Sequence, residues 1–225
     1  MRFFTALLVA ATLAAAFSRA HAQDQAAMPL KQGSYFVLEG GVNFNAPTNT
    51  YNGFAGRDQR ANLKTGYAVS GASGYKWANG LRAEGELTYR RNTFKYFDAP
   101  TNPYAGRQIS LTLMANAIYE FSTGSRLTPY IGAGVGLTMA WLNNLTQLNF
   151  GVTSFNNTDS SRFAYQGIAG VAIAIAPEWE ALMDVRYRVS DGHTFRTNNV
   201  AGTFNSLSKY NIRDTTVMAG LRYAF

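Results

Sequence analysis

The chain has 225 residues, of which 47% are hydrophobic and 14% aromatic, with a mean hydropathy of −0.14 and a net charge of +7. This aromatic content excludes a disordered chain. Beyond the N-terminus, no apolar stretch reaches the ~20 residues that a membrane-spanning helix needs. The absence of cysteine excludes disulfide scaffolds, thiolate metal centres and cysteine nucleophiles.

Residues 1–22 have the pattern of a secretory signal peptide. A short positive start precedes an apolar run that ends at Phe17, and Ala20 and Ala22 form a small-x-small cleavage pattern. The run is shorter than a bilayer-spanning helix. We expect cleavage after Ala22, which removes two arginines and no acid and leaves a net charge of +5. Residues 23–32 are then a periplasmic N-terminal segment, and residues 33–225 form one domain.

From residue 35 onward, apolar residues recur at every second position, which is the period of β-strands. No 3.6-residue repeat is sustained, and Asn79-Gly80 suits a tight hairpin turn. The pattern predicts eight strands, whose apolar faces span residues 36–44, 67–77, 81–89, 109–121, 129–141, 163–175, 179–189 and 215–225.

The two faces of these strands differ in charge. The apolar face carries no charged residue, whereas a soluble sandwich or lipocalin-like barrel would bury that face, so alternation alone does not say which face meets water. The opposite face carries six cations and seven anions: Glu39, Lys76, Arg82, Glu84, Glu86, Arg90, Glu120, Glu180, Asp184, Arg186, Arg188, Asp214 and Arg222.

Three features favour a barrel surrounded by lipid. Aromatic residues cluster at the strand ends of the apolar face, the charges of the other face nearly balance, and the connections alternate in length. Connections near 78–80, 122–126 and 176–178 are short, and those near 46–64, 95–107, 142–161 and 190–210 are long. The predicted fold is all-β: a closed antiparallel eight-stranded transmembrane barrel of up-and-down topology, with short periplasmic turns, long external loops and a lumen filled by its own ion pairs.

Several stretches resemble the small outer-membrane β-barrel superfamily of opacity-type proteins and related surface antigens. They are the leader and the segments 35–41, 129–137, 185–188 and 219–225. The resemblance implies eight antiparallel strands in the bacterial outer membrane. It also implies recognition of the last strand by the outer-membrane insertion machinery, with Tyr223 and Phe225 as the matching positions. Because no peptidoglycan-binding segment follows Phe225, we do not expect the wall-anchoring role of some larger relatives.

Candidate catalytic groups are few. His193 is the single histidine left after cleavage, and Ser190 and Asp191 are its neighbours, but nearness in sequence does not place a base against a nucleophile. We therefore expect a solvated loop histidine. Glu84 and Glu86 are interpreted as part of the lumen network, and the glycines at 132, 134 and 136 as aids to close packing of the barrel wall. We expect no cofactor, metal site or nucleic-acid partner.

The predicted loops and rims carry an excess of positive charge. If the loops face outward, these cations lie level with the phosphates of lipopolysaccharide, which would attract them; a merely solvated rim is the alternative. The ten cations are Arg57, Arg60, Lys64, Arg91, Lys95, Arg107, Arg162, Arg196, Lys209 and Arg213.

The expected function is that of a monomeric, non-enzymatic outer-membrane protein that supports the envelope and displays its loops. Its expected partners are outer-membrane lipid, lipopolysaccharide and the insertion machinery. A narrow ion or small-solute channel is the first alternative, and a lipid-A-modifying enzyme or an adhesin is the second.

Overall fold

The computed structural model describes residues 32–52, 57–97, 104–147, 160–198 and 205–225. The predicted signal peptide, and all of the segment 23–32 except Gln32, lie outside these ranges. Within them, no helix has the length and apolar character needed to cross a bilayer.

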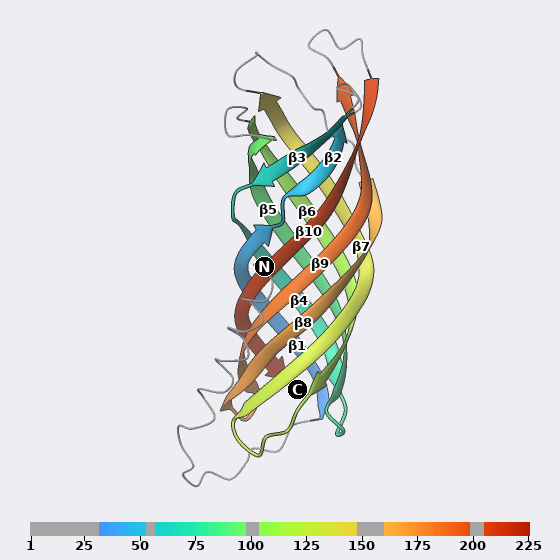
Figure 1. The fold of residues 1–225 in the computed structure, drawn as a ribbon. Helices are drawn as coiled ribbons and strands as arrows, with labels where there is room; N and C mark the ends of the chain where they lie inside the picture. The colour runs from blue at the N-terminus through green and yellow to red at the C-terminus, as the bar shows by residue number, and fades with distance from the viewer. Residues whose placement is uncertain (1–31, 53–56, 98–103, 148–159, 199–204) are drawn as a thin grey trace.

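The described residues form ten strands in a single sheet (Figure 1). Consecutive long strands run antiparallel to one another and are strongly tilted, as the ribbon shows. The strands are β1 (Gly33–Asn45), β2 (Thr48–Asn52), β3 (Arg57–Leu63), β4 (Gly66–Lys76), β5 (Leu81–Phe97), β6 (Tyr104–Glu120), β7 (Leu127–Gln147), β8 (Ser160–Ala176), β9 (Trp179–Asn198) and β10 (Asn205–Ala224).

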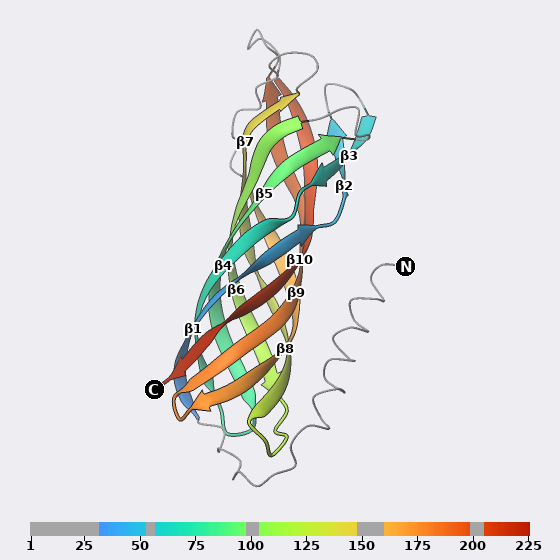
Figure 2. The same ribbon diagram turned by 90° about the vertical axis from the view of Figure 1, so that its left-hand side faces the viewer.

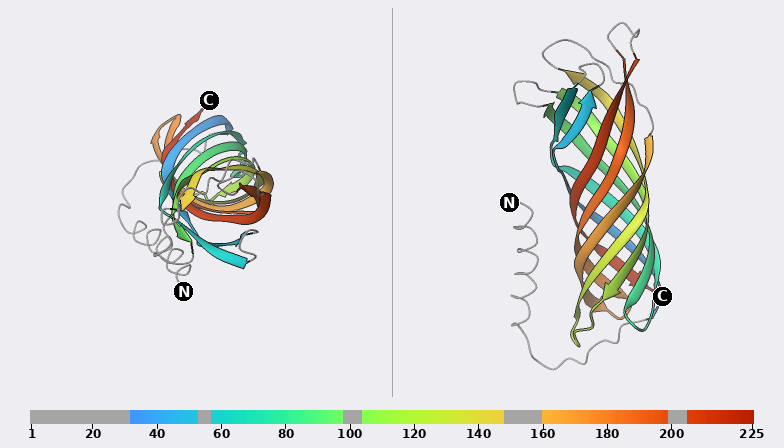
Figure 3. Two further views of the ribbon diagram at one scale, coloured as in Figure 1. Left: turned by 90° about the horizontal axis from the view of Figure 1, so that it is seen from above. Right: turned by 45° about the vertical axis from the view of Figure 1, so that its right-hand side comes forward.

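Eight of these strands pair into a closed ring, and the left view of Figure 3 shows the barrel from above. β1 pairs with β4, each strand from β4 to β9 pairs with the next, and β10 returns to β1 from Tyr35↔Ala224 to Asn45↔Asp214. Over the length in which all eight strands pair, closure removes the open edges of the sheet, which is the condition for strands to cross hydrocarbon. The predicted eight-stranded antiparallel barrel is therefore confirmed.

The remaining two strands form a hairpin at one end of the barrel. β2 pairs with β10 and β3 pairs with β5, so the hairpin continues the wall where β1 and β4 stop (Figure 2). Pro47 lies at the break between β1 and β2, where its missing N–H cannot join a ladder. We call this end the loop end, and the end with the connections 77–80, 121–126 and 177–178 the turn end.

The strands are longer at the loop end than the sequence predicts. β5 continues to Phe97, β6 begins at Tyr104, and much of the predicted connection 46–64 is the β2–β3 hairpin. Likewise β9 reaches Asn198 and β10 starts at Asn205, inside the predicted connection 190–210. The predicted bounds of the long connections were therefore wrong, because the strands continue into segments where the outer face becomes polar and the lipid-facing pattern fades.

The apolar face points outward, as predicted. Leu38 is 67% exposed and its chain neighbour Glu39 only 2%, and the same alternation runs along the other barrel strands. Val189 is an exception at 4% exposure, and its cross-strand partners are Tyr165 and Arg213. A slip of one residue would turn the interior charges toward lipid, at about 2–4 kcal/mol for each Arg or Lys near the midplane.

Aromatic side chains form belts near both ends of the apolar face. At the turn end, ring centroids lie 5.7 Å apart for Phe36 and Phe225, and 4.9 Å for Trp179 and Tyr223. Toward the loop end, Tyr67 and Tyr89 lie 6.2 Å apart. Such belts mark the boundaries between hydrocarbon and headgroups.

Candidate functional site

The thirteen charged residues predicted to line the lumen all point into the barrel. Twelve are buried, and the Glu180 side chain is 22% exposed near the turn end. They come from β1, β4, β5, β6, β9 and β10, and each faces inward because every second residue of a strand does so. Charges from distant parts of the sequence therefore meet in one low-dielectric interior.

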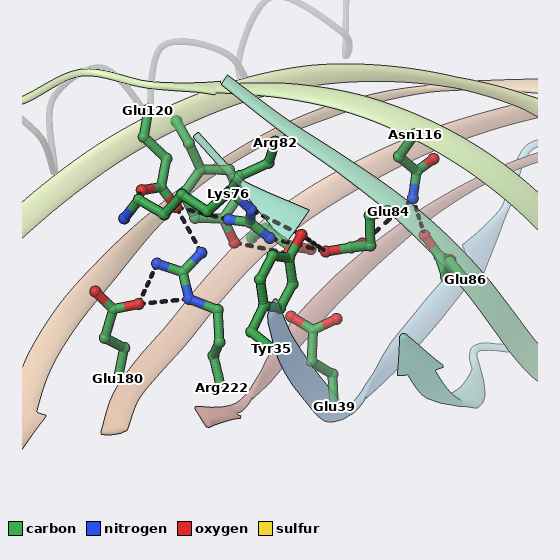
Figure 4. A network of polar contacts seen from close by, with 12 residues as sticks. Tyr35, Glu39, Lys76, Arg82, Glu84, Glu86, Asn116, Glu120, Glu180 and Arg222 are labelled. Atoms are coloured by element: carbon green, nitrogen blue, oxygen red, sulfur yellow. Dashed lines mark hydrogen bonds and ion pairs between the residues drawn. The ribbon is translucent and has the colours of Figure 1, made fainter. Parts of the chain in front are cut away.

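The first group, the turn-side cluster, is centred on Glu120 (Figure 4). Lys76 Nζ and Arg222 Nη1 each lie 2.5 Å from a Glu120 carboxylate oxygen, and Arg82 Nη1 lies 2.7 Å from it. Arg82 also pairs with Glu84 at 2.8 Å, and Arg222 with Glu180. The cluster contains three cations and three carboxylates, so it is neutral in formal charge.

Tyr35 completes the turn-side cluster from β1. Its hydroxyl donates to Glu84 Oε2 at 3.0 Å and accepts from Arg82 Nε at 3.0 Å. The guanidinium of Arg82 also lies 4.9 Å from the centre of the Tyr35 ring. This ring packs among buried apolar side chains of the interior, including Val37 and Ile118, and so anchors the charged groups to the wall.

The central cluster consists of Arg186 with Glu39, Glu86 and Asp184. Arg186 Nη2 pairs with Glu39, Nη1 lies 3.1 Å from Glu86 Oε1, and Nε lies 2.9 Å from Asp184 Oδ1. One guanidinium thus joins strands β1, β5 and β9. Its planar donors suit several carboxylates at once, which a lysine ammonium would not match.

Neutral donors supplement the single cation of the central cluster. Asn116 and Gln166 each donate to Glu86 Oε2 at 2.8 Å, and the Tyr130 hydroxyl donates to Asp184 Oδ2 at 2.9 Å. Buried carboxylates need such hydrogen bonds to offset their lost hydration. The cluster therefore combines one ion-pair hub with amide and phenol donors from β6, β7 and β8.

The loop-side cluster contains two cations, Arg90 and Arg188, around the single carboxylate of Asp214. The central cluster, by contrast, has one cation and three carboxylates. Arg188 pairs with Asp214, and Arg90 Nε lies 3.8 Å from Asp214 Oδ1. Hydroxyl groups take up further guanidinium donors, among them Thr138 at 3.2 Å from Arg188 and Thr216 at 3.3 Å from Arg90.

An apolar group, which we call the loop-end plug, fills the interior beyond the loop-side cluster. Its residues follow the charged positions along the inward faces of β5 and β10 and are joined by residues of β7 and of the hairpin strand β3. The strand pattern did not predict this plug, because it lies partly in segments expected to be loops; continued alternation beyond Arg90 was the available signal. The buried members are Ala61, Phe94, Ala140, Leu142, Tyr210 and Ile212.

His193 lies inside the barrel, and the prediction of a solvated loop histidine was wrong. It is 0% exposed on β9, and its Nε2 lies 2.9 Å from Ser190 Oγ. Ser190 faces inward in the same alternation as Arg186 and Arg188, whereas a register shift at Tyr210/Ile212, beside a left-handed Gly192 (φ +80°), turns His193 inward as well. This irregularity could not be read from alternation.

The geometry does not assemble a catalytic triad from these residues. Ser190 Oγ donates to the carbonyl of Phe163 at 3.1 Å, so its proton is engaged away from the imidazole. Asp191 is exposed on the outside, 3.9 Å from Arg213. A triad needs the acid to orient the base, and this acid lies on the other face of the wall. Glu84 and Glu86 are likewise held by cations and amides.

The predicted basic rim lies on the outer surface at the loop end. Of the ten cations, Arg60, Lys64, Lys95, Arg107, Arg162, Lys209 and Arg213 are exposed and Arg91 is half-buried. The side chains of Arg57 and Arg196 lie outside the described part of the structure. Tyr223 and Phe225 belong to the turn-end aromatic belt, with ring centroids 5.2 Å apart.

Among the residues that the structure describes, no three His, Asp or Glu side chains are arranged to hold a metal ion. A closed barrel with an apolar outer face, aromatic belts and a charged interior defines the class of outer-membrane β-barrel proteins. Residues 6–225 match the family described as outer membrane protein beta-barrel domain, and the chain belongs to this family. It is accordingly a protein of the bacterial outer membrane.

Known proteins support this assignment. An outer membrane protein of Gluconacetobacter diazotrophicus is 30% identical over 253 residues, covering all of this chain and 64% of that protein. Outer membrane protein PagN of Salmonella typhimurium is 27% identical over 158 residues, 64% of this chain and 65% of PagN. The chain thus spans less than two thirds of the length of these relatives. The crystal structure of OprG from Pseudomonas aeruginosa shares the fold, with a TM-score of 0.59 at 15% identity over 86% of this chain and 97% of OprG.

Proposed function

We propose that this protein is a non-conducting, non-enzymatic barrel that supports the outer membrane and displays its loop end to the exterior. The observation that carries the proposal is the filled interior: three ion-pair clusters follow one another along the axis, and the apolar loop-end plug follows them. An eight-stranded barrel is just narrow enough for side chains to fill it.

Passage of an ion would require breaking several of these contacts together. Removing one partner of a buried ion pair leaves an uncompensated charge in a low-dielectric site, which is strongly unfavourable. An ion that passed the clusters would next meet the plug around Phe94 and Leu142, where no charged side chain offsets its lost hydration. Charges in this interior therefore serve to hold the wall together rather than to conduct.

The test is current measurement across planar lipid bilayers, with a general-diffusion porin as the positive control. We expect the folded protein, verified by its heat-dependent shift on gels, to give no steady single-channel current. Arg186→Gln and the outer-surface variant Arg213→Gln are compared with it. Steady currents that change in Arg186→Gln but not in Arg213→Gln would contradict the proposal and establish the channel alternative.

A further inference from the structure

Four cations surround one exposed threonine on the outer face of the barrel. Thr93 of β5 has Arg107 of β6 as its cross-strand partner, and on its other side the Lys64 amide donates to the Thr93 carbonyl at 2.7 Å. Arg91 precedes Thr93 by two positions on the same face, and exposed Lys95 follows it at the bulge opposite Asn62 and Leu63. Lys64, Arg91, Thr93, Lys95 and Arg107 are called the Thr93 cluster below.

Strand geometry brings these side chains within reach of one ligand. Directly opposed residues have Cβ atoms about 5 Å apart, and residues two positions apart on a strand are about 7 Å apart. Arginine and lysine side chains are longer than these separations, so their charged ends can converge over the Thr93 hydroxyl. The result is a donor-rich patch with a central O–H.

The Thr93 cluster has no acidic side chain to balance it within the described ranges. None of its four cations forms an ion pair there, and the cross-strand partners of Arg91 and Arg107 are Tyr67, Ile109, Thr93 and Asn143. The opposite side of the rim, which carries Arg162, Lys209 and Arg213, differs in how its cations are paired.

On that opposite side, the wall itself engages two of the three cations. Arg162 donates to the carbonyls of Gly192 at 2.6 Å and Ser161 at 3.0 Å, and Arg213 lies 3.9 Å from Asp191. The unsatisfied positive charge of the rim is therefore concentrated at the Thr93 cluster.

The height of the cluster identifies the ligand. Arg91 pairs directly with Tyr67, whose ring contacts Tyr89 in the loop-end aromatic belt, so the cluster lies just beyond the hydrocarbon. Phosphate groups stand at this level of the outer leaflet, and a phosphate accepts hydrogen bonds from guanidinium, ammonium and hydroxyl groups together. We infer that the Thr93 cluster binds a phosphate group of lipopolysaccharide.

This inference rests on the outward orientation of the loop end in the proposed function. The inference and the proposed non-conducting barrel can fail independently. Absence of lipopolysaccharide binding would leave the bilayer-current result unchanged, and a measured current would not alter binding at the outer wall.

The experiment compares two triple variants of the full mature protein that remove the same charge from the rim. Lys64→Gln/Arg91→Gln/Arg107→Gln changes the Thr93 cluster, and Arg162→Gln/Lys209→Gln/Arg213→Gln changes the opposite side. Lipopolysaccharide retained after mild detergent extraction and washing is measured by mass spectrometry per folded protein. We expect at least about a tenfold loss in the first variant and little change in the second, because charge-assisted contacts disappear only in the first.

Equal losses in the two variants, or no loss in the first, would overturn the inference. Thr93→Val keeps every charge and tests the site should the triple variant not fold; retention at the wild-type level would count against a phosphate seated on Thr93. In reconstituted bicelles, lipopolysaccharide stripped of its phosphates should bind weakly. If inorganic phosphate alone saturated the Thr93 cluster, with no preference for lipopolysaccharide, the ligand would be free phosphate rather than the lipid, and the inference would be contradicted.

Discussion

At the scale of single residues, the interior shows how buried charge becomes tolerable in this fold. Glu120 is the partner of three cations, Lys76, Arg82 and Arg222, which come from three different strands. Each cation alone would face a large desolvation penalty, and the shared carboxylate offsets it through direct contacts. The same carboxylate therefore holds β4, β5, β6 and β10 together at the turn end.

Glu120→Gln should therefore destabilise the barrel strongly. The substitution keeps the shape of the side chain but leaves three buried cations with two carboxylates, at a cost of about 3–5 kcal/mol. Asp191→Asn, in the half-exposed pair with Arg213, is the control and should cost less than about 1 kcal/mol. Urea titration of both variants in lipid vesicles measures the difference, and equal midpoints would refute the role given to Glu120.

At the scale of strands, β6 and β7 pack closely because glycine alternates with larger residues across their interface. A Cβ placed on Gly134 would collide with Asn116 Oδ1, and one on Gly132 with Ile118. The absent side chains thus let Asn116 reach Glu86 in the central cluster. The sequence prediction that these glycines allow close wall packing agrees with this geometry.

Gly134→Ala should accordingly disturb the interior, whereas Gly167→Ala should not. Gly134 has no room for a methyl group, so Asn116 must move, at an expected cost of about 1–3 kcal/mol. Gly167 on β8 faces open space outside, and an added methyl group meets no atom within 4 Å. Gel heat-shift temperatures should fall for the first variant and stay near wild type for the second; a reversed order would show that backbone preference dominates.

At the scale of the whole molecule, closure between the first and last strands makes the barrel. The β1–β10 ladder places Phe225 beside Phe36, and the same ring contacts Tyr223. Two roles are compatible with this position: a belt residue that anchors the barrel at the membrane boundary, and a terminal signal read during insertion. The belt role acts in the folded barrel, whereas the signal role acts during insertion.

Phe225→Ala separates these roles when it is compared with Phe36→Ala. Both variants remove the Phe36–Phe225 contact, and Phe225→Ala also removes the Phe225–Tyr223 contact, so their stabilities after folding into vesicles should differ by no more than one ring pair, about 0.5–1.5 kcal/mol. We expect Phe225→Ala alone to lower the amount of folded barrel in cell outer membranes, by several-fold. Similar cellular yields for the two variants would reduce Phe225 to an ordinary belt residue.

The periodicity and charge pattern of the chain were sufficient to predict the class of fold and the facing of nearly every barrel side chain. Alternation with a period of two is a local property of strands, and lipid on one side forces all charges to the other, so Glu39 and Arg186 could be assigned to the interior before their partners were known. Which of these charges meet depends on the folded barrel. Glu39 and Arg186 are 147 positions apart, and their pairing depends on ring closure and register.

The same distinction explains the errors. His193 turns inward, against Ser190, because of a local register shift that breaks the alternation on which the prediction relied. The loop-end plug and the Thr93 cluster arise where neighbouring strands continue beyond the lipid belt. Their pairing brings Phe94 and Tyr210 together inside the barrel, and Lys64 and Arg107 together on its outer wall. A linear pattern records the face of each residue, but the lateral neighbours of that residue are fixed only when the sheet closes.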